Sequence, residues 1–159
     1  MDKYNQAILW PVNSKPLRSD MLPEEADVEK HCELARIGRA VYWDIKPKRK
    51  ELEGPFDGYL YIALPVGRVV YRCVVDHVIS RDRLLNMQNE HEYVPPFRKQ
   101  CLFGFFEDGR KHEISHTWIK MREIRRLDEP IGLDRFRKRD GTPVRSTHSG
   151  LIYIQAPNI

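Results

Sequence analysis

One segment of the sequence has the residue types and spacing of a catalytic metal site. Residues 112–116 read HEISH, and the HExxH spacing on a helix puts two imidazoles on one face to bind zinc beside a glutamate base. The neighbouring residues favour a strand instead, because Asp108-Gly109 predicts a tight turn and residues 117–119 (TWI) are β-prone. At a rise of about 3.3 Å per residue, the two histidines of a strand stand roughly 13 Å apart, too far for one zinc ion. A zinc hydrolase is therefore the remote alternative.

Other catalytic signatures are missing from the sequence. It has no GxSxG elbow, no Walker A loop and no GxGxxG motif, and neither Asp44 nor Asp76 has a carboxylate partner nearby in sequence. Cys32, Cys73 and Cys101 are far apart, which predicts reduced, buried thiols rather than disulfides or a zinc site. We expect a binding module with no cofactor and no metal. Any cleavage or GTPase activity would reside in another domain or subunit, and a hydrolase with an unrecognised site is the alternative.

Basic residues gather in two clusters that could contact phosphate groups. The formal net charge is +4, which permits an acidic partner such as nucleic acid. The residues that we expect to bind phosphate are Lys46, Lys48, Arg49 and Lys50 in the first cluster, and Arg137, Lys138, Arg139 and Arg145 in the second. Such contacts would make the affinity depend on salt. A solvated basic loop is the alternative for each cluster.

Aromatic and amide side chains offer a second chemistry, the recognition of a base. A flipped or methylated base is held between aromatic faces, which Trp10, Trp43 and Trp118 could provide. Asn13 and Ser14 follow the first apolar run, and an Asn amide can both donate to and accept from a base edge. The alternatives are that the tryptophans belong to the core and that Asn13 and Ser14 form an ordinary turn.

The elements that must position these residues begin with strands and one helix. Residues 6–12 (QAILWPV) form a compact apolar run, typical of a buried strand. Residues 23–37 open with Pro and acids and stop before Gly38, which predicts a helix. Further runs rich in Val, Ile and Tyr predict strands over residues 39–45, 59–64 and 69–79.

The second half of the chain has one hairpin signal. Residues 101–106 and 112–124 flank Asp108-Gly109, and we expect them to pair as strands around that turn. Residues 151–154 (LIYI) predict a last strand. Short helices are expected over residues 81–92 and 133–136.

These elements predict one α+β domain over residues 1–159. About six strands with two or three helices outside them favour a small mixed β-barrel. At 159 residues the chain is long enough for one core and too short for two ordinary domains. No apolar run approaches the roughly 20 residues needed to cross a bilayer, and the start of the chain lacks a secretory signal. We therefore expect a cytoplasmic location.

Several segments together resemble the EVE and YTH branch of the PUA-like superfamily. Residues 7–14 (AILWPVNS) are similar to the opening strand of those domains, and residues 36–43 (RIGRAVYW) are similar to a helix that ends at Gly and enters a strand. The other similar segments are residues 69–80, 118–131, 139–144 and 150–154. The resemblance implies a PUA-like mixed β-barrel that binds nucleic acid.

The resemblance also implies roles for particular residues. In these domains a polar residue after the first strand contacts the base, which points to Asn13. A basic residue near the end of a YTH domain meets phosphate, which points to Arg139 or Arg145. YTH domains place a cage tryptophan after their first strand, and residues 17–33 contain none. The candidates for that wall are Trp10, Tyr42 and Trp43.

EVE-like modules also occur as specificity domains of McrBC-type, modification-dependent restriction systems. There they work beside a GTPase motor and a nuclease subunit, so the chain could be one part of a longer protein. The resemblance implies binding to methylated DNA, carrying N6-methyladenine or 5-methylcytosine, with the base flipped into an aromatic pocket. The alternatives are an RNA-binding PUA-like module and a barrel that binds a protein or a small ligand.

Overall fold

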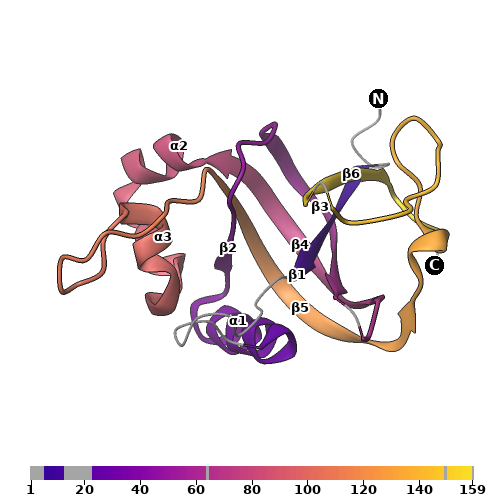
Figure 1. Cartoon of the computed structure of the whole chain (residues 1–159), viewed down its shortest axis with the longest axis horizontal. Helices are drawn as coiled ribbons and strands as arrows, with labels where there is room; N and C mark the ends of the chain where they lie inside the picture. The colour runs from indigo at the N-terminus through magenta and orange to yellow at the C-terminus, as the bar shows by residue number, and fades with distance from the viewer. Residues whose placement is uncertain (1–5, 13–22, 64, 149, 159) are drawn as a thin grey trace.

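Six strands form one mixed sheet in the order β2-β5-β4-β3-β1-β6 (Figure 1). The computed structural model describes residues 6–12, 23–63, 65–148 and 150–158. The strands are β1 (Gln6–Val12), β2 (Val41–Ile45), β3 (Leu52–Ile62), β4 (Arg68–Ser80), β5 (Thr117–Ile131) and β6 (Ile152–Gln155). β1 and β3 run parallel, and every other neighbouring pair is antiparallel. The α+β class and the number of strands are as predicted.

The sheet is not closed into a barrel, which corrects the predicted architecture. Among the described residues, β2 pairs along its length only with β5, and β6 pairs in this way only with β1. Closure would need these two edge strands to meet, and they are the shortest of the six, with 5 and 4 residues. Hydrophobic alternation predicts that a strand exists but not which strand lies beside it.

Helix α1 (Glu24–Gly38) covers the sheet against β5 and β2. It buries Val28, Cys32 and Ala35, and it carries acids in its first turn, where they complement the helix dipole. The predicted helix over residues 23–37 is confirmed, with each boundary one residue further along the chain: it follows Pro23 and includes Gly38. Arg39 comes next in the left-handed conformation, with φ 76°.

The second predicted helix is shorter than expected. Helix α2 (Arg81–Asn86) is capped by Ser80, whose Oγ accepts a hydrogen bond from the Arg83 amide at 3.2 Å. A 3₁₀ helix, Gln88–Tyr93, continues the segment. The helical turn expected near residue 133 is confirmed as the 3₁₀ helix Leu133–Arg135.

The predicted hairpin around Asp108-Gly109 is wrong in its arms and right in its turn. Residues 99–103 form helix α3 (Lys99–Phe103), which ends at Gly104 with φ +84°. Residues 112–116 form no strand, and β5 begins only at Thr117. The turn itself is present, with Gly109 at φ +89° and a single bridge between Phe105 and Lys111. Pro95-Pro96 before the helix and Gly104 after it are helix signals, but the β-prone residues between them outweighed these signals in the prediction.

β3 starts earlier than the predicted strand over residues 59–64, at Leu52, and runs through Gly54-Pro55. The register shifts between Glu53 and Phe56, so the Gly-Pro pair sits in an irregular part of the ladder with β4. A Cβ at Gly54 would collide with the backbone oxygen of Val75. A bulged strand can therefore use Gly and Pro that a regular strand rejects.

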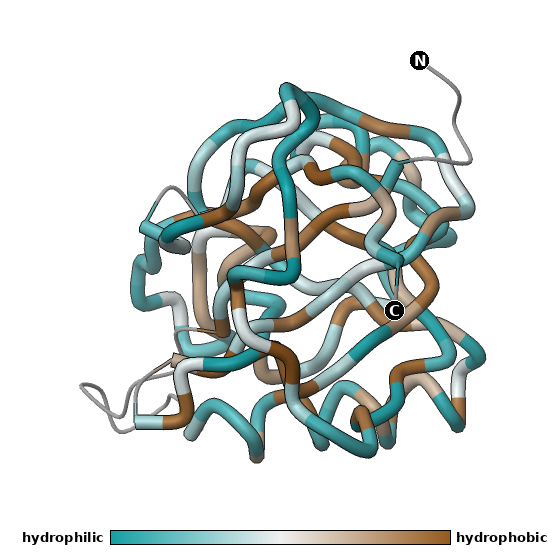
Figure 2. Tube along the Cα trace, turned by 90° about the vertical axis from the view of Figure 1, so that its right-hand side faces the viewer, coloured by the Kyte–Doolittle hydropathy of each residue, from teal (hydrophilic) through white to brown (hydrophobic). Residues whose placement is uncertain are grey.

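The core lies along the strands, and hydrophobic segments thread the interior of the molecule while hydrophilic segments surround them (Figure 2). Its largest cluster includes Trp10, Leu60, Val75 and Ile119, all fully buried. The three cysteines are free and buried, as predicted. Among the described residues, no helix is long and apolar enough to cross a membrane.

Candidate nucleic-acid interface

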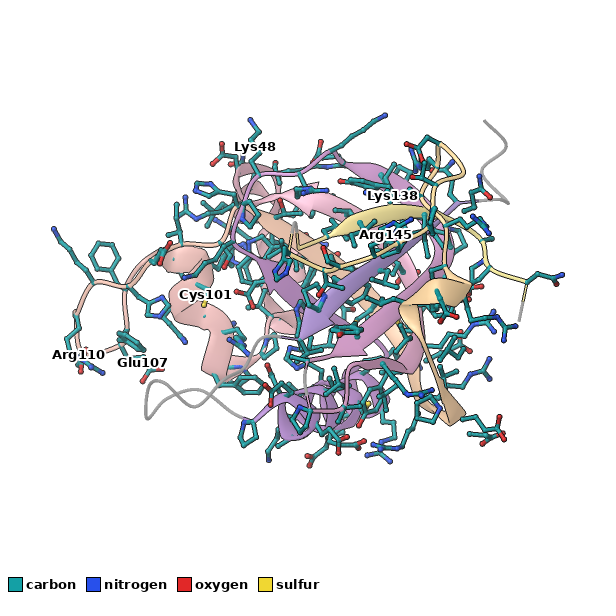
Figure 3. All side chains as sticks on the ribbon, turned by 45° about the vertical axis from the view of Figure 1, so that its right-hand side comes forward. Lys48, Cys101, Glu107, Arg110, Lys138 and Arg145 are labelled. Atoms are coloured by element: carbon teal, nitrogen blue, oxygen red, sulfur yellow. The ribbon has the colours of Figure 1, made fainter. Side chains whose placement is uncertain are left out.

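The two basic clusters of the sequence meet at Tyr153 on β6. The guanidinium carbon of Arg49 lies 5.5 Å from the centroid of the Tyr153 ring, and that of Arg139 lies 5.3 Å from the same centroid. Both distances are within cation–π range. We call the resulting surface the basic face, made of Lys48, Arg49, Lys50, Arg137, Lys138, Arg139 and Arg145. Lys48, Lys138 and Arg145 lie along one side of the molecule, with β6 near them (Figure 3).

The first cluster lies in the connection between β2 and β3, and hydrogen bonds fix its backbone. Thr117 Oγ1 donates to the Pro47 carbonyl at 2.7 Å and accepts from the Arg49 amide at 2.9 Å. The Tyr153 hydroxyl donates to the Lys50 carbonyl at 2.6 Å. Burial raises the pKa of Tyr153, so this hydroxyl keeps its proton at neutral pH. The loop is thereby fastened to both β5 and β6.

The second cluster is built on a tight turn beside β6. The Lys138 amide donates to the Thr142 carbonyl at 2.8 Å, and Gly141 takes φ +89° at the tip. The Thr142 hydroxyl and amide both donate to Asp140 Oδ1, and these bonds lower the pKa of the Asp140 carboxyl. A bridge between Lys138 and Ile154 joins the turn to β6. The backbone under the cations is therefore well defined.

A hollow of about 500 Å³ opens at this second cluster. It is lined by Lys138, Thr142, Pro143, Arg145, Ser146 and His148. The lining contains cations and the Ser146 hydroxyl and no carboxylate, although the Thr142 hydroxyl already donates to the neighbouring Asp140. Such a site suits a phosphate group, which accepts hydrogen bonds from both cations and hydroxyl groups.

Several cations of the basic face have no ion-pair partner within the described part of the chain. Lys48, Lys50, Lys138 and Arg145 are exposed and form no salt bridge there, although Asp140 lies near Lys138. Lys46 differs, because its Nζ pairs with Glu113 Oε2 at 2.9 Å. Lys46 is thus the predicted phosphate ligand that the geometry supports least.

The predicted base-binding aromatics are buried. Trp10, Tyr42 and Trp118 are 0% exposed and Trp43 is 5% exposed. Trp118 Nε1 donates to the Ser115 carbonyl at 2.9 Å, and the Tyr42 hydroxyl donates to Glu90 at 2.8 Å. Their polar atoms therefore already have partners within the chain, as expected of core residues.

Trp10 and Trp43 lie in a different setting, an aromatic cluster with polar atoms that lack partners. The Trp43 ring centroid lies 6.5 Å from that of Trp10 and 4.4 Å from that of His31, and Phe97 meets His31 edge-on at 5.5 Å. Trp10 Nε1 and His31 Nε2 are buried and have no hydrogen-bond partner among the described residues. Buried polar groups without a partner are uncommon, and a water molecule or another polar group usually satisfies them.

The contact made by Nδ1 of His31 shows which ring nitrogen carries a hydrogen. His31 Nδ1 lies 2.7 Å from the backbone carbonyl of Asp27, which can only accept, so Nδ1 carries a hydrogen. The same nitrogen lies 3.3 Å from Asp27 Oδ1. Trp10 Nε1 is a donor, so the cluster offers at least one hydrogen-bond donor beside Trp43.

Charged groups surround this cluster. Arg98 forms an ion pair with the fully buried Asp27, and its Nε lies 3.8 Å from Asp44 Oδ1. Ser115 Oγ donates to Asp44 at 2.6 Å. Asn13 and Ser14 follow β1 in the sequence and lie outside the described residues.

Residues 112–116 do not form a metal site in the geometry that HExxH requires. The segment is irregular and not the predicted strand, and His112 Nδ1 is 2.7 Å from the Glu113 carbonyl. Across the described ranges, no three His, Cys, Asp or Glu side chains gather closely enough to hold a metal ion.

Sequence reasoning missed Tyr153, His31 and His148. In the sequence, Tyr153 is an ordinary strand residue and His31 is a polar residue of a helix. The residues that contact them in the fold come from distant segments of the chain. His148 lies close enough to Arg145 in sequence to have been included in the second cluster.

Comparisons with protein-family models and with curated proteins find no match for this chain.

Proposed function

We propose that the chain is a nucleic-acid-binding module of the PUA-like, EVE/YTH type. The observation that carries the proposal is the convergence of two distant basic clusters on Tyr153, beside a hollow without carboxylates. Phosphate contacts supply most of the affinity of such modules and require unpaired Lys and Arg side chains on one surface. Lys48, Lys50, Lys138 and Arg145 meet that requirement.

We further propose that a modified base is read at the other end of β1. Arg139 Nη2 donates to Gln6 at the start of this strand, and Trp10 lies near its end. Seven residues at about 3.3 Å each span roughly 20 Å, the length of about six stacked bases. One nucleic acid bound to the basic face by its phosphates therefore reaches the far end of β1, where the buried Trp10 and Trp43 would have to become accessible to a flipped base.

In this proposal Asn13 and Ser14 read the edge of the base beside Trp10 and Trp43. The preferred target is DNA with N6-methyladenine or 5-methylcytosine, by analogy with the modification-dependent restriction systems that the sequence resembles. Extrusion of the base costs a few kcal/mol, which stacking and hydrogen bonds must offset. The chain itself would carry no catalysis. A GTPase motor and a nuclease subunit would be its partners.

Fluorescence anisotropy with labelled oligonucleotides tests this function. The same short sequence is compared as unmodified duplex, as duplex with either methylated base, and as single-stranded RNA, at two salt concentrations. We expect tighter binding to one methylated duplex and weaker binding to all of them at high salt. Undetectable binding to every probe would contradict the whole proposal. Equal binding to all duplexes would contradict base reading, and tightest binding to RNA would support the RNA-binding alternative.

A further inference from the structure

We infer that a second copy of this chain docks on an exposed aromatic surface at the α3 end of the molecule. We call it the phenylalanine face. It consists of Phe97, Phe103, Phe105 and Phe106 around a hollow of about 960 Å³. This self-association is independent of nucleic-acid binding.

Exposed apolar side chains concentrate at this end. In the part of the chain that the structure describes, the exposed large hydrophobic residues are Ile37, Val66, Phe103 and Phe105. Phe103 is 41% and Phe105 is 54% exposed. Ile37, at 78%, lines an adjoining hollow of about 240 Å³ that shares Pro96 with the first. Contiguous exposed apolar surface of this kind marks interaction sites.

The charges on the rim favour a second copy over a polyanion. Lys99 and Arg110 are balanced by Glu107 and Asp108, so the formal charge of the lining is zero. A two-fold contact places a patch against itself and therefore needs either no charge or both signs. A nucleic acid would meet two carboxylates here, in contrast to the hollow at Lys138 and Arg145.

Two of the aromatic rings, those of Phe103 and Phe106, are held in place before any contact forms. The Phe106 amide donates to the Arg110 carbonyl at 2.9 Å, and the Arg110 guanidinium lies 4.4 Å from the Phe106 ring centroid. Phe106 also meets the His112 ring edge-on at 5.1 Å, and Phe103 meets the His91 ring at 5.5 Å. Rings already ordered in the free chain lose little entropy on docking.

The position of this face leaves the basic face open in a dimer. Glu107 and Arg110 lie at the tip of the loop after α3, and Lys138 and Arg145 lie toward the opposite end of the molecule (Figure 3). Two copies joined at their phenylalanine faces would keep their positive surfaces far apart. Charge repulsion between the copies is then small.

Sedimentation equilibrium of the whole chain tests the inference. The mass should rise from 18.8 kDa toward twice that value as the protein concentration is raised to about 100 µM. Phe105→Asp should raise the dimer dissociation constant by roughly tenfold or more, since exposed aromatics dominate such contacts. Glu107→Lys gives the rim a net positive charge and should weaken the dimer as well. Val66→Asp is the matched control, because Val66 is exposed outside this face, and it should dimerise like the parent.

Three results would overturn the inference. They are a parent chain that is monomeric at every concentration, a Phe105→Asp variant that dimerises like the parent, and a variant that loses nucleic-acid affinity without any change of mass. Thermal unfolding of each variant checks that it is folded. Anisotropy with duplex DNA is measured separately, so that failure of nucleic-acid binding and failure of dimerisation are distinguished.

Discussion

Tyr153 joins two parts of the chain that are far apart in sequence. Its ring lies under both Arg49 and Arg139, and its hydroxyl donates to Lys50. Arg49 also donates to the Leu151 carbonyl and Arg139 to Gln6 Oε1, so the ring and these acceptors together fix the two guanidinium groups. Tyr153 itself is uncharged, and its role is to position the Arg49 and Arg139 side chains.

Replacing Tyr153 separates the two contributions of this side chain. Tyr153→Phe keeps the ring and loses one hydrogen bond, which should cost about 1 kcal/mol of folding stability and little duplex affinity. Tyr153→Leu removes the ring under both guanidinium groups and should weaken duplex binding several-fold. Urea unfolding and anisotropy measure the two effects. Equal affinities for the Phe and Leu variants would show that the ring does not position the arginines.

Arg145→Ala tests the hollow at the second basic cluster. Loss of one phosphate contact should weaken binding to methylated and unmodified duplexes alike and reduce the slope of log affinity against log salt by about 1. Arg110→Ala is the control, because Arg110 is also exposed but pairs with Asp108 at 2.7 Å on the other end of the molecule. An Arg110 variant that loses as much affinity as the Arg145 variant would place binding elsewhere.

At the scale of elements, a polar network joins β2, β4 and β5 to the 3₁₀ helix after α2. Glu90 accepts hydrogen bonds at 2.8 Å from both the Tyr42 hydroxyl and Lys120 Nζ, and His77 Nε2 lies 2.9 Å from the same hydroxyl. Burial raises the pKa of Glu90, but the bonds from Lys120 and Tyr42 outweigh it, so that the pKa is lowered. Burial lowers the pKa of His77.

Both shifts predict acid destabilisation. A group whose pKa is lower in the folded state stabilises the fold above its unfolded pKa and loses that contribution as the pH falls. The unfolding free energy should therefore fall below pH 6.5 as His77 is protonated, and again below pH 4.5 as Glu90 is protonated. Urea unfolding at several pH values measures this. A free energy that is constant between pH 7 and pH 4 would contradict it.

Glu90→Gln tests the network directly. It leaves the Lys120 ammonium, whose side chain is 17% exposed, without its carboxylate, which should cost about 3 kcal/mol at neutral pH. The variant should also lose the acid step near pH 4.5. Glu129→Gln, at an exposed position of β5, is the control and should unfold like the parent. An unchanged acid step in the Glu90 variant would assign that step to another carboxyl group.

The packing of β1 on β3 depends on a small residue at Gly58. A Cβ there would lie 2.7 Å from Val75 Cγ2 and 2.9 Å from both Cys73 Sγ and Trp10 Cζ3. Gly58→Ala should therefore destabilise the chain by about 1–3 kcal/mol in urea unfolding. Gly38→Ala, where a Cβ meets nothing within 4 Å, should be neutral or slightly stabilising because Ala suits a helix better. A Gly58 variant as stable as the parent would mean that the sheet shifts freely at this point.

Local patterns in the sequence predicted the elements better than the site. Strand β1, helix α1 and the turn at Gly109 follow from nearby residues: an apolar run, a Pro-to-Gly interval and an Asp-Gly pair. The open sheet depends on pairing between distant segments, which periodicity does not encode. Helix α3 does have local signals, Pro95-Pro96 before it and Gly104 after it, but the β-prone residues outweighed them in the prediction. The two basic clusters could be predicted because the residues of each cluster are close together in the sequence. Their meeting at Tyr153, and the burial of Trp10 and Trp43 beside His31, could not be predicted because they involve residues far apart in the sequence.

At the scale of the whole molecule, two surfaces of different character lie toward opposite ends. The basic face gathers around β6, and the phenylalanine face surrounds the loop after α3 (Figure 1, Figure 3). The first suits a polyanion and the second a neutral, apolar partner. A dimer joined through the second would leave both basic faces exposed at its far ends.

The most direct test of nucleic-acid binding by the basic face is a backbone amide NMR titration with a short methylated duplex. Shifts are predicted to concentrate at residues 46–50, 137–148 and 153, with a second group near the end of β1, and to leave residues 97–110 unmoved. Shifts confined to the phenylalanine face, or none at all at saturating duplex, would contradict the proposed interface.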